Sequence, residues 1–479
     1  MALLEALVEF DRTGPGLADR LTGALRDAIV SGRLVAGNRL PSSRDLAIDL
    51  RLSRGVVVEA YERLVAEGRL LSRRGSGTTV APGQPERASG RQDSGQAEPG
   101  RRESGREGPD RWESGRAQPV NRIRPLRPGV PDLGMFPRVA WRRAYERALR
   151  QARAVDLDYG DPAGAPRLRA ELAGYLGRVR AARVHPGDLF ATTGAGQAFG
   201  LVAGALRAAG VTAVGMEEPG SASIREHLVA HGVGLVPVPV DAGGLDVTAL
   251  ERTGVRAVLV TPAHQFPTGV VLAPDRRTAL FGWARRVDGL IVEDDYDAEF
   301  RYDRDPVGCL QGVAPELVAH IGSASKALAP ALRLGWLAVP PRWRAAVRSG
   351  KLAADVCGPV LEQLAFAELL ASGGYDQHLR RLRRMHRIRR DAVVTAVRRY
   401  LPSARISGIA AGLHLVVELP DGTDDVTLAR SAAQAGLGPL PLSRLRVDPG
   451  GPPGLVLGYA THPPDVLTQA VATLADLAG

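Results

Sequence analysis

The sequence predicts an α/β protein with a mainly parallel sheet, preceded by a small N-terminal α+β domain. From residue 121 onward, short apolar runs alternate with amphipathic helical segments, a pattern typical of a parallel sheet covered by helices. Residues 13–81 instead show three helical segments followed by a hairpin. Residues 82–120 are rich in Gly, Ser, Pro, Arg and Glu and contain almost no aliphatic side chains. We therefore expect two domains, 13–81 and 121–479, joined by a linker.

The linker is expected to be flexible and uncharged overall. It cannot bury enough apolar surface to offset the entropy of ordering. Its arginines and its acidic residues balance, so it is not a basic arm for DNA. A random coil of this length spans roughly 35 Å, which lets the flanking domains lie on different subunits.

Composition excludes several classes of protein. The apolar content of 44% and the mean hydropathy of -0.08 predict a soluble protein with a large core. The N-terminus lacks a basic leader and no apolar run is long enough for a membrane span, so we expect a cytoplasmic location. Two cysteines and nine histidines without metal-ligand spacing argue against a disulfide framework or a metal centre. The net charge of +10 permits an anionic partner such as nucleic acid.

The N-terminal domain is predicted to be a helix-turn-helix with a wing. LPSSRDLAIDLRLSRGVVVEAYERL encodes two helices separated by the turn 51–53, and Ser42 or Ser43 can cap the first helix as Ser53 can cap the second. The second helix of such a pair presents its N-terminal residues to the major groove, while the basic hairpin tip 73–77 lies close to the backbone or enters the minor groove. The residues expected to contact double-stranded DNA are Arg44, Ser53, Arg54, Arg74, Gly75 and Gly77.

A helical packing module with solvated arginines is the alternative for this region. The motifs LPSSRDLA, LSRGVVVEAYERLVAEG and GSGTTV, however, resemble the winged helix of GntR-type transcriptional repressors in order and spacing. One departure is Gly55, which stands where the recognition helix usually carries a polar contact residue. The resemblance implies a DNA-binding domain of about 70 residues.

Three polar loops of the second domain are expected to meet at one edge of its sheet. The apolar runs VRAVLV, GLIV and LVAHIG lead directly into TPAHQFPTG, EDDYDAEF and SASKALAPALR. In an open parallel sheet, ligands bind at the carboxyl ends of the strands. The three loops therefore predict a single site.

Lys326, in the third loop, is the candidate for covalent chemistry. It is one of only two lysines among 62 basic residues, and a lysine amine, unlike an arginine, condenses with an aldehyde. We interpret the other, Lys351 in RSGKLAAD, as a surface residue. Asp294 and Tyr296 are two apart in an extended segment and share a face, whereas Asp295 faces the other way.

The same loops suit an aromatic aldehyde that carries a phosphate. Asp294 is placed to pair with a ring nitrogen and Tyr296 to donate to a ring hydroxyl. TTGAGQAFG supplies a glycine turn before a helix, and Ser323 and Arg333 flank the lysine. The alternatives are that the carboxylates cap a strand or bind a structural arginine, that the glycine turn is a plain turn, and that Arg333 is a surface charge.

A second resemblance covers about 350 residues. YGDPAGAPRLRAELAGYL, TTGAGQAFG, TPAHQFPTG, EDDYDAEF and SASKALAPALRLGW are similar to the fold type I, aminotransferase-like domain of MocR-type regulators, in which a GntR winged helix precedes that domain and a small α/β subdomain ends it. It implies that Lys326 binds pyridoxal 5'-phosphate as an internal aldimine. The other cofactor contacts that it implies are Asp294, Tyr296, Ser323, Arg333, Ala195, Gly196 and His264. It also implies a head-to-tail homodimer, each winged helix resting on the other subunit.

Three positions depart from the family pattern. Ser221 stands where an aromatic residue stacks on the cofactor, Gly196 where glutamine is common, and Val456 where aminotransferases carry an arginine for the substrate carboxylate. Losing that arginine removes a contact of about 1.5 to 3 kcal/mol, so we expect at most vestigial transaminase activity.

The sequence therefore predicts a transcriptional regulator whose effector is pyridoxal 5'-phosphate, alone or with an amine or amino acid, and whose ligand state is coupled to operator binding. The first alternative is a functional pyridoxal-phosphate-dependent aminotransferase with a DNA-binding appendage. The second is a dimerisation scaffold that has lost its cofactor.

Overall fold

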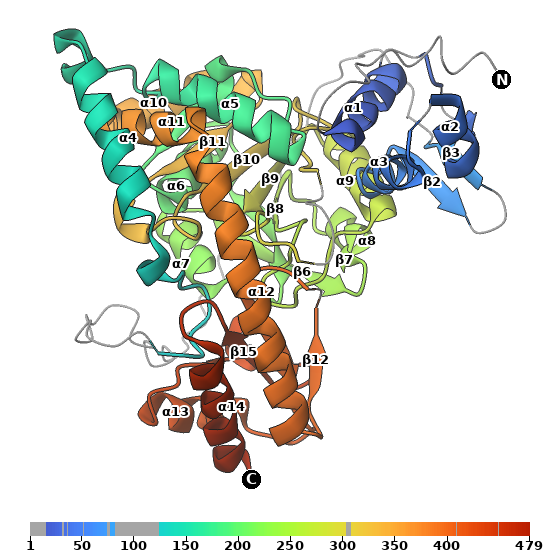
Figure 1. The fold of residues 1–479 in the computed structure, drawn as a ribbon, viewed down its shortest axis with the longest axis vertical. Coiled ribbons are helices and arrows are strands. Elements are labelled where there is room, and N and C mark those ends of the chain that lie inside the picture. Colours follow the sequence, from blue (N-terminus) through green and yellow to red (C-terminus); the bar gives the residue numbers. More distant parts are fainter. Residues whose placement is uncertain are drawn as a thin grey trace, which may run out of the picture.

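The computed structural model describes residues 16–30, 33–35, 37–50, 52–73, 77–81, 124–302, 308–408, 410–448 and 450–479. The predicted linker, 82–120, lies outside these ranges. In the described residues, the chain forms a winged helix, a large domain and a small C-terminal domain (Figure 1). The predicted α/β architecture with a mainly parallel sheet and an N-terminal winged helix is confirmed.

The winged helix is built as its caps and apolar spacing predict. Ser53 accepts a hydrogen bond from the amide of Val56, and Ser42 accepts one from Asp45, so each helix of the pair begins at a serine cap. Leucines of all three helices meet in one core. The elements are α1 (Leu17–Val30), β1 (Arg39–Leu40), α2 (Ser43–Leu50), α3 (Arg54–Ala66), β2 (Leu70–Arg73) and β3 (Gly77–Val80), with the antiparallel strand order β1-β3-β2.

The large domain centres on an eight-stranded sheet of order β4-β11-β10-β9-β8-β5-β6-β7. Its strands are β4 (Leu189–Thr192), β5 (Ala213–Glu218), β6 (Gly234–Asp241), β7 (Gly244–Leu245), β8 (Ala257–Val260), β9 (Leu290–Asp295), β10 (Val318–Ser323) and β11 (Gly335–Ala338). The five strands from β10 to β6 run parallel, and the remaining pairs are antiparallel.

Helices cover both faces of this sheet. They are α4 (Arg138–Gln151), α5 (Pro166–Arg180), α6 (Ala195–Ala208), α7 (Ala222–Ala230), α8 (Val247–Glu251), α9 (Pro274–Arg286), α10 (Arg344–Asp355), α11 (Val360–Ala371) and α12 (Gly374–Tyr400). On β8 and β9, Leu259 and Val292 pack with α6, whereas Val258 and Ile291 pack with α8 and α9. This alternation decides which side chains of β9 reach the face where α6 begins.

The small domain is joined to the large one by α12, which contributes to both cores. Leu379 and Leu382 belong to the large-domain core, while Val393 and Val397 belong to the small-domain core (Figure 1). The small domain comprises β12 (Arg405–Ser407), β13 (His414–Glu418), α13 (Asp425–Gln434), β14 (Leu440–Pro441), β15 (Gly454–Gly458) and α14 (Pro464–Ala478), with an antiparallel sheet of order β12-β13-β15-β14.

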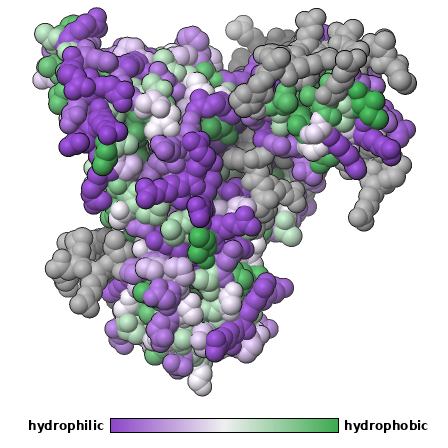
Figure 2. Space-filling view, viewed as in Figure 1, coloured by the Kyte–Doolittle hydropathy of each residue, from purple (hydrophilic) through white to green (hydrophobic). Residues whose placement is uncertain are grey.

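The winged helix contacts α9 of its own large domain. A Cβ on Gly68, just after α3, would lie 3.1 Å from Oγ1 of Thr278. The swapped arrangement implied for a homodimer stays a prediction about the dimer. Hydrophilic residues cover much of the face seen in Figure 2, including the exposed side of α12. Among the residues that the structure describes, no helix combines the length and the apolar character needed to cross a membrane.

Candidate functional site

A cavity of about 590 Å³ lies where β8, β9 and β10 end and α6 begins. It is lined by seven of the eight residues predicted to bind a cofactor: Lys326, Asp294, Tyr296, Ser323, Arg333, Ala195 and Gly196. A second cavity, of about 630 Å³, is lined by the end of α4, residues 152–167 and the start of α11, and contains none of them. The edge where ligands bind in open parallel sheets therefore holds the predicted site.

Lys326 follows β10 and points its amine into the cavity wall. Its Nζ donates to the backbone carbonyl of Gly129, and a Cβ on Gly129 would lie 3.6 Å from that nitrogen. Burial lowers the pKa of Lys326, although the carboxylates of Asp297 and Asp294 act in the opposite direction. The neutral, nucleophilic amine is therefore easier to form than at a solvated lysine.

Asp294 and Asp295 are adjacent on β9 but lie in opposite environments. Burial, together with the nearby carboxylates of Asp295 and Asp297, raises the pKa of Asp294 to about 8. Asp295 accepts from Nε of Arg180 at 2.7 Å and from Nε2 of His320 at 3.0 Å. Burial alone would raise the pKa of Asp295, but these two partners hold it below its usual value. Of these two neighbours, Asp294 is the one left to pair with a cation in the cavity.

The other end of the cavity suits an anion. The first turn of α6, at Ala195 and Gly196, follows Gly194 at φ 92°, and no side chain within the described chain caps it. Arg333 donates to the carbonyl of Thr193, and a Cβ on Gly194 would lie 2.9 Å from the Arg333 guanidinium. Free helix amides beside a guanidinium bind anions such as phosphate.

Ser323, at the end of β10, adds a hydroxyl to this end. Its Oγ donates to Oγ of Ser325 at 2.7 Å and accepts from the Ser325 amide at 3.0 Å. Both serines line the cavity. The segment that carries the lysine therefore also brings hydroxyl groups to the anion-binding end.

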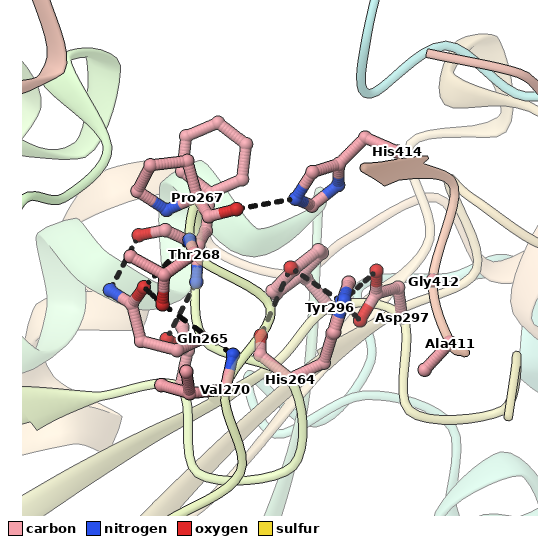
Figure 3. Close-up of polar contacts among 12 residues, drawn as sticks. His264, Gln265, Pro267, Thr268, Val270, Tyr296, Asp297, Ala411, Gly412 and His414 are labelled. Carbon is pink, nitrogen blue, oxygen red and sulfur yellow. Dashed lines mark hydrogen bonds and ion pairs between the residues drawn. The ribbon is translucent and has the colours of Figure 1, made fainter. Parts of the chain in front are cut away.

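His264 does not line the cavity, which corrects its placement as a direct cofactor contact. Its side chain is 3% exposed and contacts Tyr296 and Asp297 (Figure 3). The Tyr296 hydroxyl donates to the His264 carbonyl at 3.0 Å and lies 3.1 Å from Nδ1 of the same residue. The aromatic side chain that fills the adjacent wall from the same loop is Phe266. The loop folds so that its histidine contacts the tyrosine, not the cavity.

Sequence reasoning missed several lining residues. Glu217, at the end of β5, accepts from the amide of Thr261 at 3.1 Å, and burial raises the pKa of Glu217 to about 7. His414, on β13, donates to the carbonyl of Pro267 at 3.1 Å, and burial lowers the pKa of His414 to about 3. The EEPG motif was a signal for Glu217. His414 comes from the small domain, about 150 residues along the chain from Pro267, and no local pattern marks it.

The structure shows what surrounds the three positions that depart from the family pattern, Ser221, Gly196 and Val456. Ser221 caps α7 by accepting from the amide of Ile224, and the cavity lining contains the rings of Phe199 and Phe266 besides that of Tyr296. Gly196 leaves room for the ring of His227, which a Cβ there would approach to 3.9 Å. Val456 is fully buried on β15, opposite Val416 and Leu440, in an apolar cluster. A carboxylate at that strand position would meet aliphatic side chains.

Lys351 is not a surface residue, contrary to the sequence interpretation. Its side chain is 0% exposed and pairs with Asp355 one turn along α10. The other carboxylate oxygen of Asp355 accepts from Gln197 of α6 at 2.8 Å. The polar run RSGKLAAD concealed this burial, because α10 packs on α6 through contacts distant in sequence.

The predicted DNA contacts lie on the outside of the winged helix. Arg44, Ser53 and Arg54 are exposed at the N-terminal ends of α2 and α3, and Nε of Arg54 lies 3.5 Å from Oγ of Ser43. Gly77 begins β3, whereas Arg74 and Gly75 lie outside the described residues.

Family models match both domains. The model of the class I and II aminotransferases matches residues 130–472, and the model of bacterial regulatory proteins of the gntR family matches residues 17–80. Among solved structures, the α-aminoadipate aminotransferase LysN of Thermus thermophilus covers 74% of this chain and 91% of its own, with a TM-score of 0.66 and 27% identity.

Full-length regulators align with nearly the whole chain. The HTH-type pyridoxine biosynthesis transcriptional regulator PdxR of Corynebacterium glutamicum is 34% identical over 95% of both chains. The probable rhizopine catabolism regulatory protein MocR of Rhizobium meliloti is 34% identical over 94% of this chain and 91% of its own. With a winged helix and an aminotransferase-like domain in the same order, this chain belongs to the MocR-type transcriptional regulators.

Proposed function

We propose that the large domain of this regulator holds pyridoxal 5'-phosphate covalently on Lys326, and that occupancy of the site changes how the winged helix binds operator DNA. The observation that carries the proposal is one cavity containing both a partly buried lysine and the buried carboxyl group of Asp294. Burial lowers the pKa of Lys326 and raises that of Asp294 to about 8. The neutral amine is thereby easier to form, and the protonated carboxyl can give its proton to a basic ring nitrogen and then pair with the cation.

The rest of the cavity fits this cofactor. Pyridoxal 5'-phosphate supplies an aldehyde that condenses with an amine and releases water, together with a phosphate that needs an anion site. The amides of Ala195 and Gly196, the guanidinium of Arg333 and the hydroxyl of Ser323 supply that anion site. Tyr296 lines the cavity between the loop of Phe266 and Asp294, where its hydroxyl can donate to a ring oxygen.

The site favours effector recognition over turnover of amino acids. Val456 occupies the strand position that the resemblance assigns to a carboxylate-binding arginine, and its surroundings are aliphatic. An amino-acid carboxylate placed there would lose its charge-assisted partner. A panel of amino acids should therefore convert the bound cofactor to its amine form slowly, whereas rapid conversion would favour the aminotransferase alternative.

We also propose that Arg44 and Arg54 bind DNA, with Ser53 setting the start of α3. Both guanidiniums are exposed at the helix ends that a helix-turn-helix presents to the major groove. In the dimer that the family resemblance implies, occupancy at Lys326 would alter the relative placement of the two winged helices.

The covalent site can be mapped directly because the chain has only two lysines. The full-length protein incubated with pyridoxal 5'-phosphate should gain a visible absorption band, and borohydride reduction followed by peptide mass mapping should place the label on Lys326. Lys326→Ala should abolish the band and the effect of pyridoxal 5'-phosphate on the affinity for a duplex selected from random DNA.

Arg54→Ala is the matched control for this experiment. It should keep the band but weaken DNA binding with and without pyridoxal 5'-phosphate, because it changes the winged helix alone. A label on Lys351, a protein that stays colourless, or a Lys326→Ala protein whose DNA affinity still responds to pyridoxal 5'-phosphate would overturn the proposal.

A further inference from the structure

The hydroxyl of Tyr296 contacts the buried His264, which in turn contacts the buried Asp297 (Figure 3). The hydroxyl donates to the backbone carbonyl of His264 and lies 3.1 Å from Nδ1 of that residue. The same Nδ1 lies 3.0 Å from Oδ2 of Asp297. The three side chains form a row, Tyr296–His264–Asp297, of which only the tyrosine lines the cavity.

The small domain seals this row from water. His264 and Asp297 are 3% and 2% exposed. Gly412, at φ 71°, packs over both, and a Cβ there would lie 2.5 Å from Oδ2 of Asp297. The amide of Gly412 donates to the carbonyl of Phe300 at 2.6 Å, and its own carbonyl accepts from the Tyr459 hydroxyl at 2.8 Å. Buried polar groups held this firmly keep their orientation.

The contacts within the row restrict where the protons of Tyr296 and His264 can lie. An ionised Asp297 only accepts, so the ring proton of His264 that faces it lies on Nδ1. The Tyr296 hydroxyl carries one proton, which it gives to the His264 carbonyl in this structure. A negatively charged oxygen in the cavity would compete for that proton. Once the hydroxyl turns toward the cavity, its oxygen can share the Nδ1 proton of His264 with Asp297, which makes the hydroxyl a stronger donor.

We propose that His264 and Asp297 are positioning residues for the effector. His264 aims the Tyr296 hydroxyl at an anionic oxygen on the effector ring, and Asp297, which follows the cavity-lining Tyr296 and lies 3.0 Å from Nδ1 of His264, adds a second negative charge to that side of the cavity. This inference rests on the proposed binding of pyridoxal 5'-phosphate at Lys326. It assigns the recognition of the ring oxygen to a row of three residues, two of which never touch the effector.

The two positioning residues act on the lysine-bound effector with opposite signs. A donor to the ring oxygen makes the ring oxygen and the lysine nitrogen, which share a proton, less basic. Asp297 stabilises positive charge at the lysine, because burial lowers the pKa of Lys326 and Asp297 is the largest influence that raises it. Losing His264 should therefore raise the pH at which the lysine-bound form loses its proton, and losing the charge of Asp297 should lower it.

Other ionisable groups also surround the row and the lysine. They are Asp294 beside Lys326, Glu217 at the end of β5, His414 on β13, Arg127 on the wall next to Gly129, and the phenols of Tyr302 and Tyr459. All are left unchanged in the variants below, so that a shift in the titration reports the substituted residue.

The test is a pH titration of the visible band in full-length protein saturated with pyridoxal 5'-phosphate. His264→Leu should raise the midpoint by about one pH unit, as should Tyr296→Phe, and Asp297→Asn should lower it by about one unit. His264→Asn keeps a donor near the position of Nδ1 and should restore most of the wild-type midpoint. In a Tyr296→Phe background, His264→Leu should shift the midpoint by less than a third of its effect in the wild type.

Each outcome identifies the part of the proposal that it refutes. A wild-type protein without a band refutes the proposed function itself. A normal band whose midpoint is the same in His264→Leu, or moves equally with and without the Tyr296 hydroxyl, refutes the role of His264. A midpoint in Asp297→Asn that stays or rises refutes the role of Asp297. Unfolding midpoints of each variant identify any that fail to fold, and His264→Asn then carries the test for His264.

Discussion

The two faces of β9 treat neighbouring carboxyl groups in opposite ways. On the face toward α6, Asp294 is buried beside the cavity and forms no ion pair within the described part of the chain, and its pKa rises to about 8. On the other face, Asp295 is equally buried but is held by Arg180 and His320, so its pKa falls. Both carboxyl groups are buried, so the presence or absence of a cationic partner decides whether the pKa rises or falls. A buried carboxyl group that lacks its cation marks where a cationic ligand is expected.

The largest effect on the free energy of unfolding should come from removing Arg180, the cation that pairs with Asp295 on the face of β9 away from the cavity. Arg180→Leu leaves Asp295 charged and poorly paired in the core, which costs about 3 to 5 kcal/mol of unfolding free energy. Urea unfolding followed by the fluorescence of the buried Trp283 and Trp336 measures it. The control is Arg178→Leu, two residues earlier on α5, whose exposed pair with Asp376 should contribute less than about 1 kcal/mol. Equal losses in the two variants would contradict the comparison.

A smaller effect should come from Asp294 on the cavity face, through which the free energy of unfolding depends on pH. The folded pKa of Asp294, about 8, lies above its value of roughly 3.9 in an unfolded chain. Between those two pH values the unfolded chain gives up this proton and the folded protein keeps it, so the contribution of Asp294 to stability falls as pH rises.

Asp294→Asn removes that dependence. Without pyridoxal 5'-phosphate, the stability of the variant relative to the wild type should improve by up to about 1.4 kcal/mol for each pH unit between roughly pH 5 and 7. The same substitution should weaken binding of pyridoxal 5'-phosphate, because the ring nitrogen loses its anionic partner. A stability difference that does not change with pH would show that Asp294 is ionised in the empty site.

Local patterns were sufficient for the parts of the site that a single strand or helix start defines. Strand alternation placed Asp294 and Tyr296 toward one cavity and Asp295 away from it. The glycine turn before α6 and the position of Lys326 after an apolar run predicted the two ends of the same cavity. The order of helices and hairpin likewise predicted the winged helix.

Long-range packing decided the parts that the sequence did not predict. The family resemblance implied His264 as a cofactor contact, but the loop turns its ring toward Asp297, where Gly412 of the small domain covers it. Lys351 looked exposed because its neighbours are polar, yet α10 buries it against α6. Both contacts join segments whose separation in sequence hides them from periodicity.

The smallest effect should come from the second partner of Asp295. Burial lowers the pKa of His320, but its hydrogen bond and proximity to Asp295 outweigh this, so the folded pKa lies above the usual value. Such a group adds stability below its unfolded pKa of about 6.5 and loses that contribution as pH rises through the folded pKa. His320→Gln keeps a neutral donor, so it should cost about 1 kcal/mol near pH 5.5 and clearly less near pH 8.5 in urea unfolding. A larger loss at the higher pH would mean that His320 is neutral in the fold, and that Arg180 alone separates the two faces of β9.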